Sequence, residues 1–341
     1  MSISNQKPFW LFLLIFLGAI LFVAASFLIE PTIFEVEPEI ATEPEPQEES
    51  NEITVFLVGD VMLNRGVEYM IEKKGEGDFK FPFLKITDYL KETDVLFGNL
   101  ESIISDKGYK VGSIYSFRAE TEAIEGLIYA GFDVLSLANN HAFDYTREAL
   151  EDTFLRLKDA EISYVGAGLN EEEAFSLIIK EIKGTKIGFL AYTNLGPEVW
   201  KAKDQNSGIA WIDSEDFSQI REDIERAKKE IDVLIVSLHA GEEYNTEPTQ
   251  FQIEFSKTAI EAGADLVVGH HPHVIQPIEI RQLAERKGYI AYSLGNFVFD
   301  QSFSEETMKG LLLEVIIKDK KITEINQKKI QINQYFQPTI D

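Results

Sequence analysis

Short, almost entirely apolar runs alternate with amphipathic segments along the chain after residue 52. Seven of these runs predict short β-strands, at 53–58, 95–98, 134–137, 187–192, 233–238, 266–268 and 290–293. Because such strands lack a polar face, helices or a second sheet must cover both of their sides. The amphipathic, helix-like stretches between them lie at 120–130, 147–160, 216–230 and 249–262. This alternation predicts an α/β architecture.

The end of the chain has a different pattern. Two apolar-rich segments, 311–317 and 322–332, flank Asp319, Lys320 and Lys321, which predicts a β-hairpin without a following helix. Neither an internal repeat nor a second linker is visible in the sequence. We therefore expect one domain at 53–332 and a short C-terminal tail at 333–341.

An uncharged run of 22 residues, 8–29, stands close to the N-terminus. At about 1.5 Å per helical residue it is long enough to cross a hydrocarbon core of about 30 Å. We expect a retained transmembrane anchor, with a buried helix or a cleaved signal peptide as the alternatives. Lys7 precedes the run, and no Lys or Arg follows it before Arg65. The positive-inside tendency then places residues 1–7 in the cytoplasm and the rest of the chain outside the cell, tethered to the plasma membrane by a single pass.

Residues 30–52 contain nine Glu, four Pro and no basic residue, a composition that favours an extended acidic stalk. The whole chain has 32 Lys and Arg against 58 Asp and Glu, a net charge of −26, of which −18 belongs to residues 53–341. This charge repels phosphate backbones, so nucleic acid is excluded as a partner. The absence of cysteine excludes disulfides, thiolate metal sites and lipoprotein anchoring.

All five histidines of the chain follow predicted strands. Ligand sites of open α/β sheets lie outside the carboxyl ends of the strands, where side chains from separate segments reach one cavity. A lone histidine in such a place is usually structural, but a group of five indicates a shared site. They are His141, His239, His270, His271 and His273.

Acidic and amide side chains occupy similar positions. Asp60 and Glu101 follow two of the strands, and Asn139 and Asn140 directly precede a histidine. One acid after a strand is usually a helix cap, and turn chemistry explains one Asn but not two. Neutral imidazoles with carboxylate and amide oxygens form a ligand set that suits Mn, Fe or Zn. The segments supply enough ligands for two metals, which can lower the pKa of a bridging water.

Six motifs stand in order along the chain: GDVMLNR (59–65), NLE (99–101), ANNHAFDY (138–145), HAGEEY (239–244), GHHPHVIQP (269–277) and SLGNFVFDQ (293–301). They resemble the motifs of the poly-γ-glutamate capsule biosynthesis protein CapA family, within the calcineurin-like metallophosphoesterases. The resemblance implies an α/β (α+β) four-layer sandwich of two β-sheets flanked by helices, here preceded by one transmembrane helix. It also implies two divalent metal ions at the strand ends.

The resemblance implies a role for each motif residue. The metal ligands are Asp60 and His273 for one ion, Asn140, His239 and His271 for the other, and Glu101 as the bridging carboxylate. His141 acts as general acid toward the leaving group and is oriented by Asp144. His270 is interpreted as a neighbour of the metal centre.

Four further residues are assigned to substrate binding: Arg65, Asn99, Glu243 and Asn296. For Arg65 an exposed salt bridge is an equally good interpretation. Three positions depart from what the resemblance leads one to expect. Met62 stands where the wider superfamily has the histidine of Asp-x-His, Ala240 where relatives commonly have Trp, and Thr146 where they have Gly. Met62 leaves one metal in need of another ligand.

The leading functional hypothesis is a membrane-anchored, extracellular, metal-dependent hydrolase-like protein in poly-γ-glutamate (capsule) synthesis, export or anchoring. In it, a metal-activated hydroxide attacks a phosphoester or a carbonyl. One alternative is a non-catalytic, metal-binding scaffold among the subunits of a polymer-synthase complex. Another is a phosphatase of small extracellular substrates.

Overall fold

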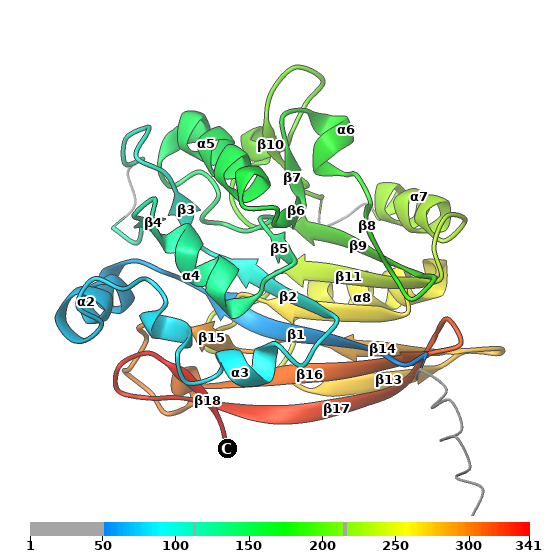
Figure 1. Cartoon of the computed structure of the whole chain (residues 1–341). Helices are drawn as coiled ribbons and strands as arrows, with labels where there is room; N and C mark the ends of the chain where they lie inside the picture. Colours follow the sequence, from blue (N-terminus) through cyan, green and yellow to red (C-terminus); the bar gives the residue numbers. More distant parts are fainter. Residues whose placement is uncertain (1–50, 112–113, 214–216) are drawn as a thin grey trace, which may run out of the picture. The chain divides into compact units, whose positions relative to one another are not determined.

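The computed structural model describes residues 51–111, 114–213 and 217–341. The predicted cytoplasmic tail, the anchor at 8–29 and nearly all of the stalk lie outside these residues. Among the described residues, no helix combines the length and apolar character needed to cross a membrane. Residues 51–341 form one compact unit, which Figure 1 shows with its helices and strands labelled.

The first sheet has eight strands, in the order β18-β17-β16-β1-β2-β5-β6, with β15 also pairing with β1. Strands β1, β2, β5, β6 and β15 are parallel to one another, and β16 joins β1 antiparallel. The strands are β1 (Ile53–Val61), β2 (Val95–Leu100), β5 (Val134–Ser136), β6 (Ser163–Val165), β15 (Asn296–Val298), β16 (Lys309–Lys318), β17 (Lys321–Ile332) and β18 (Pro338–Ile340).

The second sheet has six strands, in the order β13-β14-β12-β11-β9-β8. Its four central strands are parallel, and the two edge strands, β8 and β13, are antiparallel to their neighbours. The strands are β8 (Ile178–Ile182), β9 (Thr185–Thr193), β11 (Val233–His239), β12 (Leu266–His270), β13 (Ile278–Gln282) and β14 (Lys287–Ala291). Two short pairs stand apart: β3 (Ile103–Ile104) with β4 (Arg118–Ala119), and β7 (Ala167–Gly168) with β10 (Gly208–Ile209).

The α-helices are α2 (Arg65–Lys74), α3 (Thr87–Leu90), α4 (Ala123–Ala130), α5 (Thr146–Asp159), α6 (Glu171–Ala174), α7 (Ser218–Ala227) and α8 (Gln250–Ala262). Three 3₁₀ turns are η1 (Phe81–Phe83), η2 (Glu198–Trp200) and η3 (Glu306–Met308). Helix α8 begins with a capping box, in which the Thr249 side chain accepts the backbone N–H of Gln252 and the Gln252 side chain accepts that of Thr249. It ends at Gly263, whose φ of 130° few other residues adopt.

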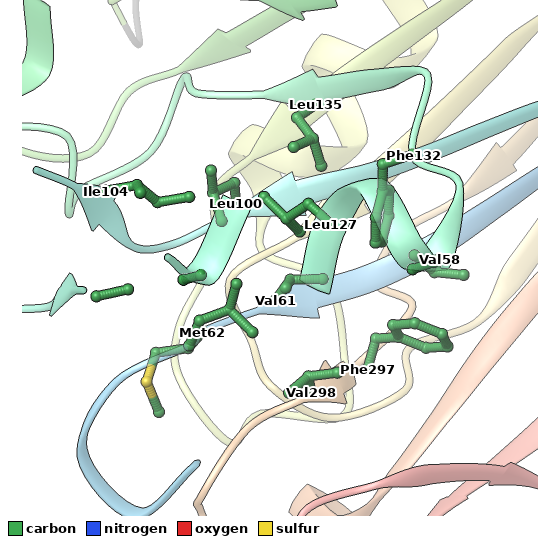
Figure 2. Packing of buried hydrophobic residues seen from close by; sticks show 14 of the residues in the cluster. Val58, Val61, Met62, Leu100, Ile104, Leu127, Phe132, Leu135, Phe297 and Val298 are labelled. Atoms are coloured by element: carbon green, nitrogen blue, oxygen red, sulfur yellow. The ribbon is translucent and has the colours of Figure 1, made fainter. Parts of the chain in front are cut away.

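The alternation of side chains along β1 explains how the layers pack. Val55 and Leu57 belong to a core cluster shared with β9, β11 and β12 of the second sheet. Phe56 and Val58 point to the opposite face, into a cluster that helices α2, α3, α4 and α5 complete. Figure 2 shows part of this cluster, with Leu127 of α4 lying over the first sheet. Helices α6, α7 and α8 cover the outer face of the second sheet. The prediction of an α/β fold with sheets covered on both sides is therefore confirmed.

Each of the seven predicted runs forms or overlaps a strand, and the C-terminal hairpin is β16–β17. Its turn residues Asp319 and Lys320 both have positive φ, 49° and 64°, as tight two-residue hairpin turns require. The segment after Ile332, which the sequence suggested to be a tail, contributes β18. The first sheet therefore continues to residue 340.

Candidate metal centre

The predicted site residues gather where the parallel strands of both sheets end. Asp60 is the penultimate residue of β1 and stands in register with Asn99 of β2. His239 ends β11 and is in register with His270, which ends β12. The residues that follow these strands lie beside them, so the carboxyl ends of the two sheets meet at one candidate site.

Two groups of side chains have the spacing of metal ligands. Asp60, Glu101 and His273 form one group and Glu243, His271 and His273 the other, with the ligand atoms of each group within 4.8 Å of one another. Atoms bound at about 2.0–2.2 Å from one ion lie about 3–4 Å apart, so only a small contraction of each group is needed. Because both groups contain His273, they belong to a single centre.

A second reason why the donor set fits divalent cations is that some of its buried atoms have no hydrogen-bond partner. Glu101 is fully buried, and its Oε2 has no hydrogen-bond partner; the Nδ1 atom of buried His271 has none either. Burial and the neighbouring charge of Asp60 raise the pKa of Glu101 well above its usual range. Unpaired buried carboxylate and imidazole atoms are costly, and a bound cation removes that cost.

The imidazoles of the centre are in the protonation state that binds metals. Burial lowers the pKa of His270 to about 4, and burial together with His273 lowers the pKa of His271 to about 3. Burial and the neighbouring His271 also lower the pKa of His239 well below its usual range. A pKa below 7 leaves each of these three rings neutral at pH 7, which is the form of imidazole that binds metal.

Asn99 is fully buried and contacts ligands of both predicted metal sites. Its Nδ2 atom donates to Asp60 Oδ1 at 2.8 Å and to Glu101 Oε1 at 3.2 Å, and lies 3.1 Å from His239 Nδ1. On the other side of the ring, His239 Nε2 lies 2.8 Å from Asn140 Oδ1. The predicted ligands His239 and Asn140 are therefore in contact, and Asn99, assigned to substrate binding, contacts three predicted ligands.

Asn296 performs a similar task for His273. Its Nδ2 atom donates to Gln301 Oε1 at 3.0 Å and to the Thr307 carbonyl at 2.9 Å, so its Oδ1 must accept. That oxygen lies 2.9 Å from His273 Nδ1, which therefore carries the proton and leaves Nε2 free for a metal. His270 is fully buried, with Nδ1 3.5 Å from Asp60 Oδ1.

The predicted general acid, His141, is in contact with Asp144, the carboxylate that was predicted to orient it. His141 Nδ1 lies 2.7 Å from Asp144 Oδ2, which also accepts the Phe117 backbone N–H at 2.7 Å. The ring of Phe117 stacks on that of His141, with centroids 3.9 Å apart. His141 Nε2 lies 4.0 Å from Glu101 Oε2. The imidazole is therefore fixed on one face and one edge, and its second nitrogen, Nε2, faces Asn140 Nδ2 at 3.3 Å as well as Glu101.

The two consecutive asparagines before His141 have different tasks. Asn139 Nδ2 donates to the Leu100 carbonyl at 2.8 Å, and its Oδ1 accepts the His141 backbone N–H at 3.0 Å. Asn139 thus attaches the loop after β5 to the end of β2. Asn140 is left to face the metal site through its contact with His239.

A cavity of about 320 Å³ opens beside these residues. Its size is that of a site for a small ligand or for one end of a larger one. Ten residues line it: Arg65, Tyr115, Phe117, His141, Glu243, Tyr244, His273, Asp300, Gln301 and Phe303. A larger cavity of about 700 Å³ lies beside α6 and α7 and contains none of the predicted site residues.

Arg65 forms the salt bridge that the sequence left open as its alternative role. Its Nε and Nη2 atoms lie 3.1 and 2.5 Å from the carboxylate oxygens of Asp300, and its guanidinium lies over the Phe117 ring. Asp300 also accepts the Gly66 backbone N–H at 2.8 Å. The basic side chain at the cavity wall is thus already neutralised.

Several cavity residues were missed by the sequence analysis. Tyr115, Phe117 and Phe303 lie in segments without periodic pattern, which offered no signal. Asp300 belongs to the sixth motif, so its position was visible but its pairing with Arg65 was not. Met62 has no access to the site, because its side chain is buried in the cluster of Figure 2 and its sulfur accepts the Asn64 backbone N–H at 3.3 Å.

The chain matches a known protein family and several known proteins. Residues 54–301 match the family described as Bacterial capsule synthesis protein PGA_cap. The chain is 30% identical over 321 residues to Capsule biosynthesis protein CapA of Bacillus anthracis, covering 93% of this chain and 74% of that protein. It is 33% identical over 263 residues to PGA biosynthesis protein CapA of Bacillus subtilis (strain 168), covering 76% and 67% of the two chains.

Among solved structures, one described as a novel phosphatase from Mycoplasma pneumoniae superposes with a TM-score of 0.48 at 16% identity, covering 83% of this chain and 94% of that chain. The family match spans β1 to Gln301, and thus all six motifs and every residue of the candidate centre. The resemblance noted from the motifs is confirmed: the chain belongs to the bacterial capsule synthesis protein PGA_cap family.

Proposed function

We propose that this member of the family is a membrane-anchored, extracellular, metal-dependent hydrolase that acts in the synthesis, export or anchoring of poly-γ-glutamate. The observation that carries the proposal is the position of His141, held by Asp144 beside the carboxylates of the candidate metal centre. The names of the Bacillus relatives, which refer to capsule and PGA biosynthesis, support the process in which it acts.

The ligands would be divided between two divalent ions, Mn, Fe or Zn, as the motifs imply: Asp60 and His273, then Asn140, His239 and His271, with Glu101 between them. When bound, such ions polarise the reacting group and lower the pKa of a coordinated water. Asn99 and Asn296 keep the ligands oriented through the hydrogen bonds described above.

His141 would act on the leaving group. The contact with Asp144 occupies Nδ1, so that Nε2 is the nitrogen that would pass a proton to the leaving group. The stacked Phe117 ring limits rotation of the imidazole. Proton transfer from a side chain positioned in this way contributes about 10²- to 10⁴-fold to a rate.

Two observations favour the alternatives. Arg65 is engaged by Asp300, and residues 53–341 carry a net charge of −18, so little in the domain attracts a long polyanion; this favours a metal-binding scaffold. The cavity of about 320 Å³ is suited to a small phosphorylated substrate.

An activity screen separates these functions. The full-length protein, loaded with Mn, Fe or Zn, is assayed with phosphodiesters, phosphomonoesters and γ-glutamyl polymers, beside His141→Ala and His271→Ala. We expect His141→Ala to lower turnover by about 10²- to 10⁴-fold with metal content unchanged, and His271→Ala to lose metal as well. A metal-loaded protein without turnover, together with normal capsule in cells that carry His141→Ala, would establish the scaffold instead.

Membrane topology has a separate test. Protease added to intact cells should release the domain by cleavage within residues 30–52, because an extended Glu- and Pro-rich segment is accessible to proteases. Complete resistance in intact cells, with cleavage after lysis, would place the domain on the cytoplasmic side.

A further inference from the structure

We propose that Glu243 is a metal ligand, which binds the ion of His271 at the point where His273, a ligand of the neighbouring ion, also lies. The inference rests on the proposed metal-dependent function. It gives Glu243 a different task from the substrate contact suggested by the sequence, and it supplies the ligand that Met62, buried in the core, does not.

The first support is geometric. A carboxylate oxygen of Glu243 and a ring nitrogen of each histidine lie within 4.8 Å of one another, although the residues come from the loops after two different strands. The Tyr244 backbone N–H donates to the Pro272 carbonyl at 2.8 Å, so the loop of Glu243 is attached to the His-Pro-His turn. This backbone hydrogen bond holds the loop of Glu243 against the turn that carries the two imidazoles.

Backbone strain is concentrated in the same two loops. Tyr244 has a φ of 66°, His271 of 97° and His273 of 58°, in the left-handed region that residues other than glycine rarely occupy. Such conformations cost about 1–3 kcal/mol each and persist where the surroundings enforce them, most often at functional sites. Here they bring the Glu243 and His271 side chains to one point.

The ligand atoms are free to bind. The His271 side chain is 7% exposed, and its Nδ1 atom is buried without a hydrogen-bond partner. His273 Nε2 is left unprotonated because Nδ1 faces Asn296 Oδ1. Arg65, the basic residue that lines the same cavity, is paired with Asp300. The Glu243 carboxylate hydrogen bonds to the Tyr244 side chain, and its remaining lone pairs can bind an ion.

Charge gives the second support. His271 and His273 bring no charge to a divalent ion, because neutral imidazole is the form that binds metal. Glu243 is the carboxylate of this group, whereas Asp60 and Glu101 are the carboxylates of the other group. With Glu243, the ion of His271 has a carboxylate of its own in addition to the shared Glu101.

The test is a count of bound Mn²⁺ in the full-length protein. After equilibration with Mn²⁺ and dialysis, elemental analysis should give two ions per chain for the unmodified protein and one for Glu243→Gln, whose affinity for the second ion falls at least tenfold. Glu242→Gln is the matched control, because this neighbouring carboxylate is exposed and hydrogen bonds only weakly to Asn245, at 3.4 Å; it should retain two.

Two Mn²⁺ ions of unchanged affinity in Glu243→Gln would overturn the assignment while the metal centre itself stands. Absence of metal from the unmodified protein would overturn both the assignment and the proposed function. Glu243→Asp keeps the carboxylate and shortens the side chain, so we expect an intermediate affinity for the second ion.

Discussion

At the scale of single residues, buried amides hold the metal-binding groups in place. Asn99 donates to two acids and meets His239, Asn139 attaches the loop of His141, and Asn296 fixes the proton of His273 on Nδ1. An amide can donate and accept at once without adding charge to a centre rich in carboxylates. Residues assigned to substrate binding from their motifs thus contact the metal-binding groups.

Replacing Asn296 tests this task. In Asn296→Ala the His273 Nδ1–H loses its acceptor at 2.9 Å and keeps only Asp60 Oδ2 at 3.4 Å, so the ring is held less firmly, and Mn²⁺ affinity should fall about 10- to 100-fold. Asn296→Asp keeps an oxygen at this place and should lose less. Asn333→Ala, at an amide that bonds to Gln337 outside the site, is the control. Equal affinities for Asn296→Ala and the control, measured by Mn²⁺ titration, would refute this role for Asn296.

At the scale of elements, helix α5 begins with a conformational conflict. Thr146, at its first position, has a φ of 73°, which β-branched residues strongly avoid. Glycine, which the family resemblance leads one to expect at this position, adopts this conformation without strain. The left-handed conformation costs about 1–2 kcal/mol for an L-residue. Glycine avoids this cost, but it loses more conformational entropy on folding, which offsets about half of the gain.

Thr146→Gly should therefore raise the free energy of unfolding by about 0.5–1 kcal/mol. Thr146→Ala keeps a Cβ atom and should gain less. Denaturant unfolding of the three proteins measures the difference. A loss of stability in Thr146→Gly would mean that the Thr146 side chain contributes more than its backbone strain costs.

The strands differ in how well the sequence predicts them. Strands β1, β2, β9 and β11 are buried on both faces, so their apolar runs were unmistakable. The edge strands β8 and β13 alternate half-buried and exposed residues and include charged ones, which resembles a loop. Strand β6 has only three residues. Their pairing depends on the neighbouring strand rather than on their own pattern.

Candidate site residues could be chosen from the sequence because their motifs follow strands whose ends must meet. The orientation of His141 by Asp144 was expected, since the two are three residues apart in one motif. The pairing of Arg65 with Asp300, 235 residues away, and the stacking of Phe117 on His141 were not. Such contacts depend on how the loops of different strands fold over the site.

At the scale of the whole molecule, charge opposes the proposed partner. Residues 53–341 carry −18, and poly-γ-glutamate is itself a polyanion. Repulsion between like-charged molecules slows their encounter, and salt screens it over about 10 Å at 0.1 M. Any attraction must therefore come from bound metal ions at short range.

The association rate of poly-γ-glutamate with the metal-loaded protein should thus rise as salt increases from about 0.05 to 0.3 M, the reverse of ordinary polyanion binding. Surface-binding kinetics at several salt concentrations measure it, with a chelator-treated sample as control. A rate that falls with salt would indicate a local basic surface for the polymer.

The central claim is that the strand ends of the two sheets hold a pair of metal ions beside His141. Anomalous diffraction from crystals grown with Mn²⁺ tests it most directly. The account predicts two anomalous peaks in the centre, one in contact with Asp60 and Glu101 and one in contact with His271 and Glu243. Crystals that diffract well but show no peak among these residues would contradict it.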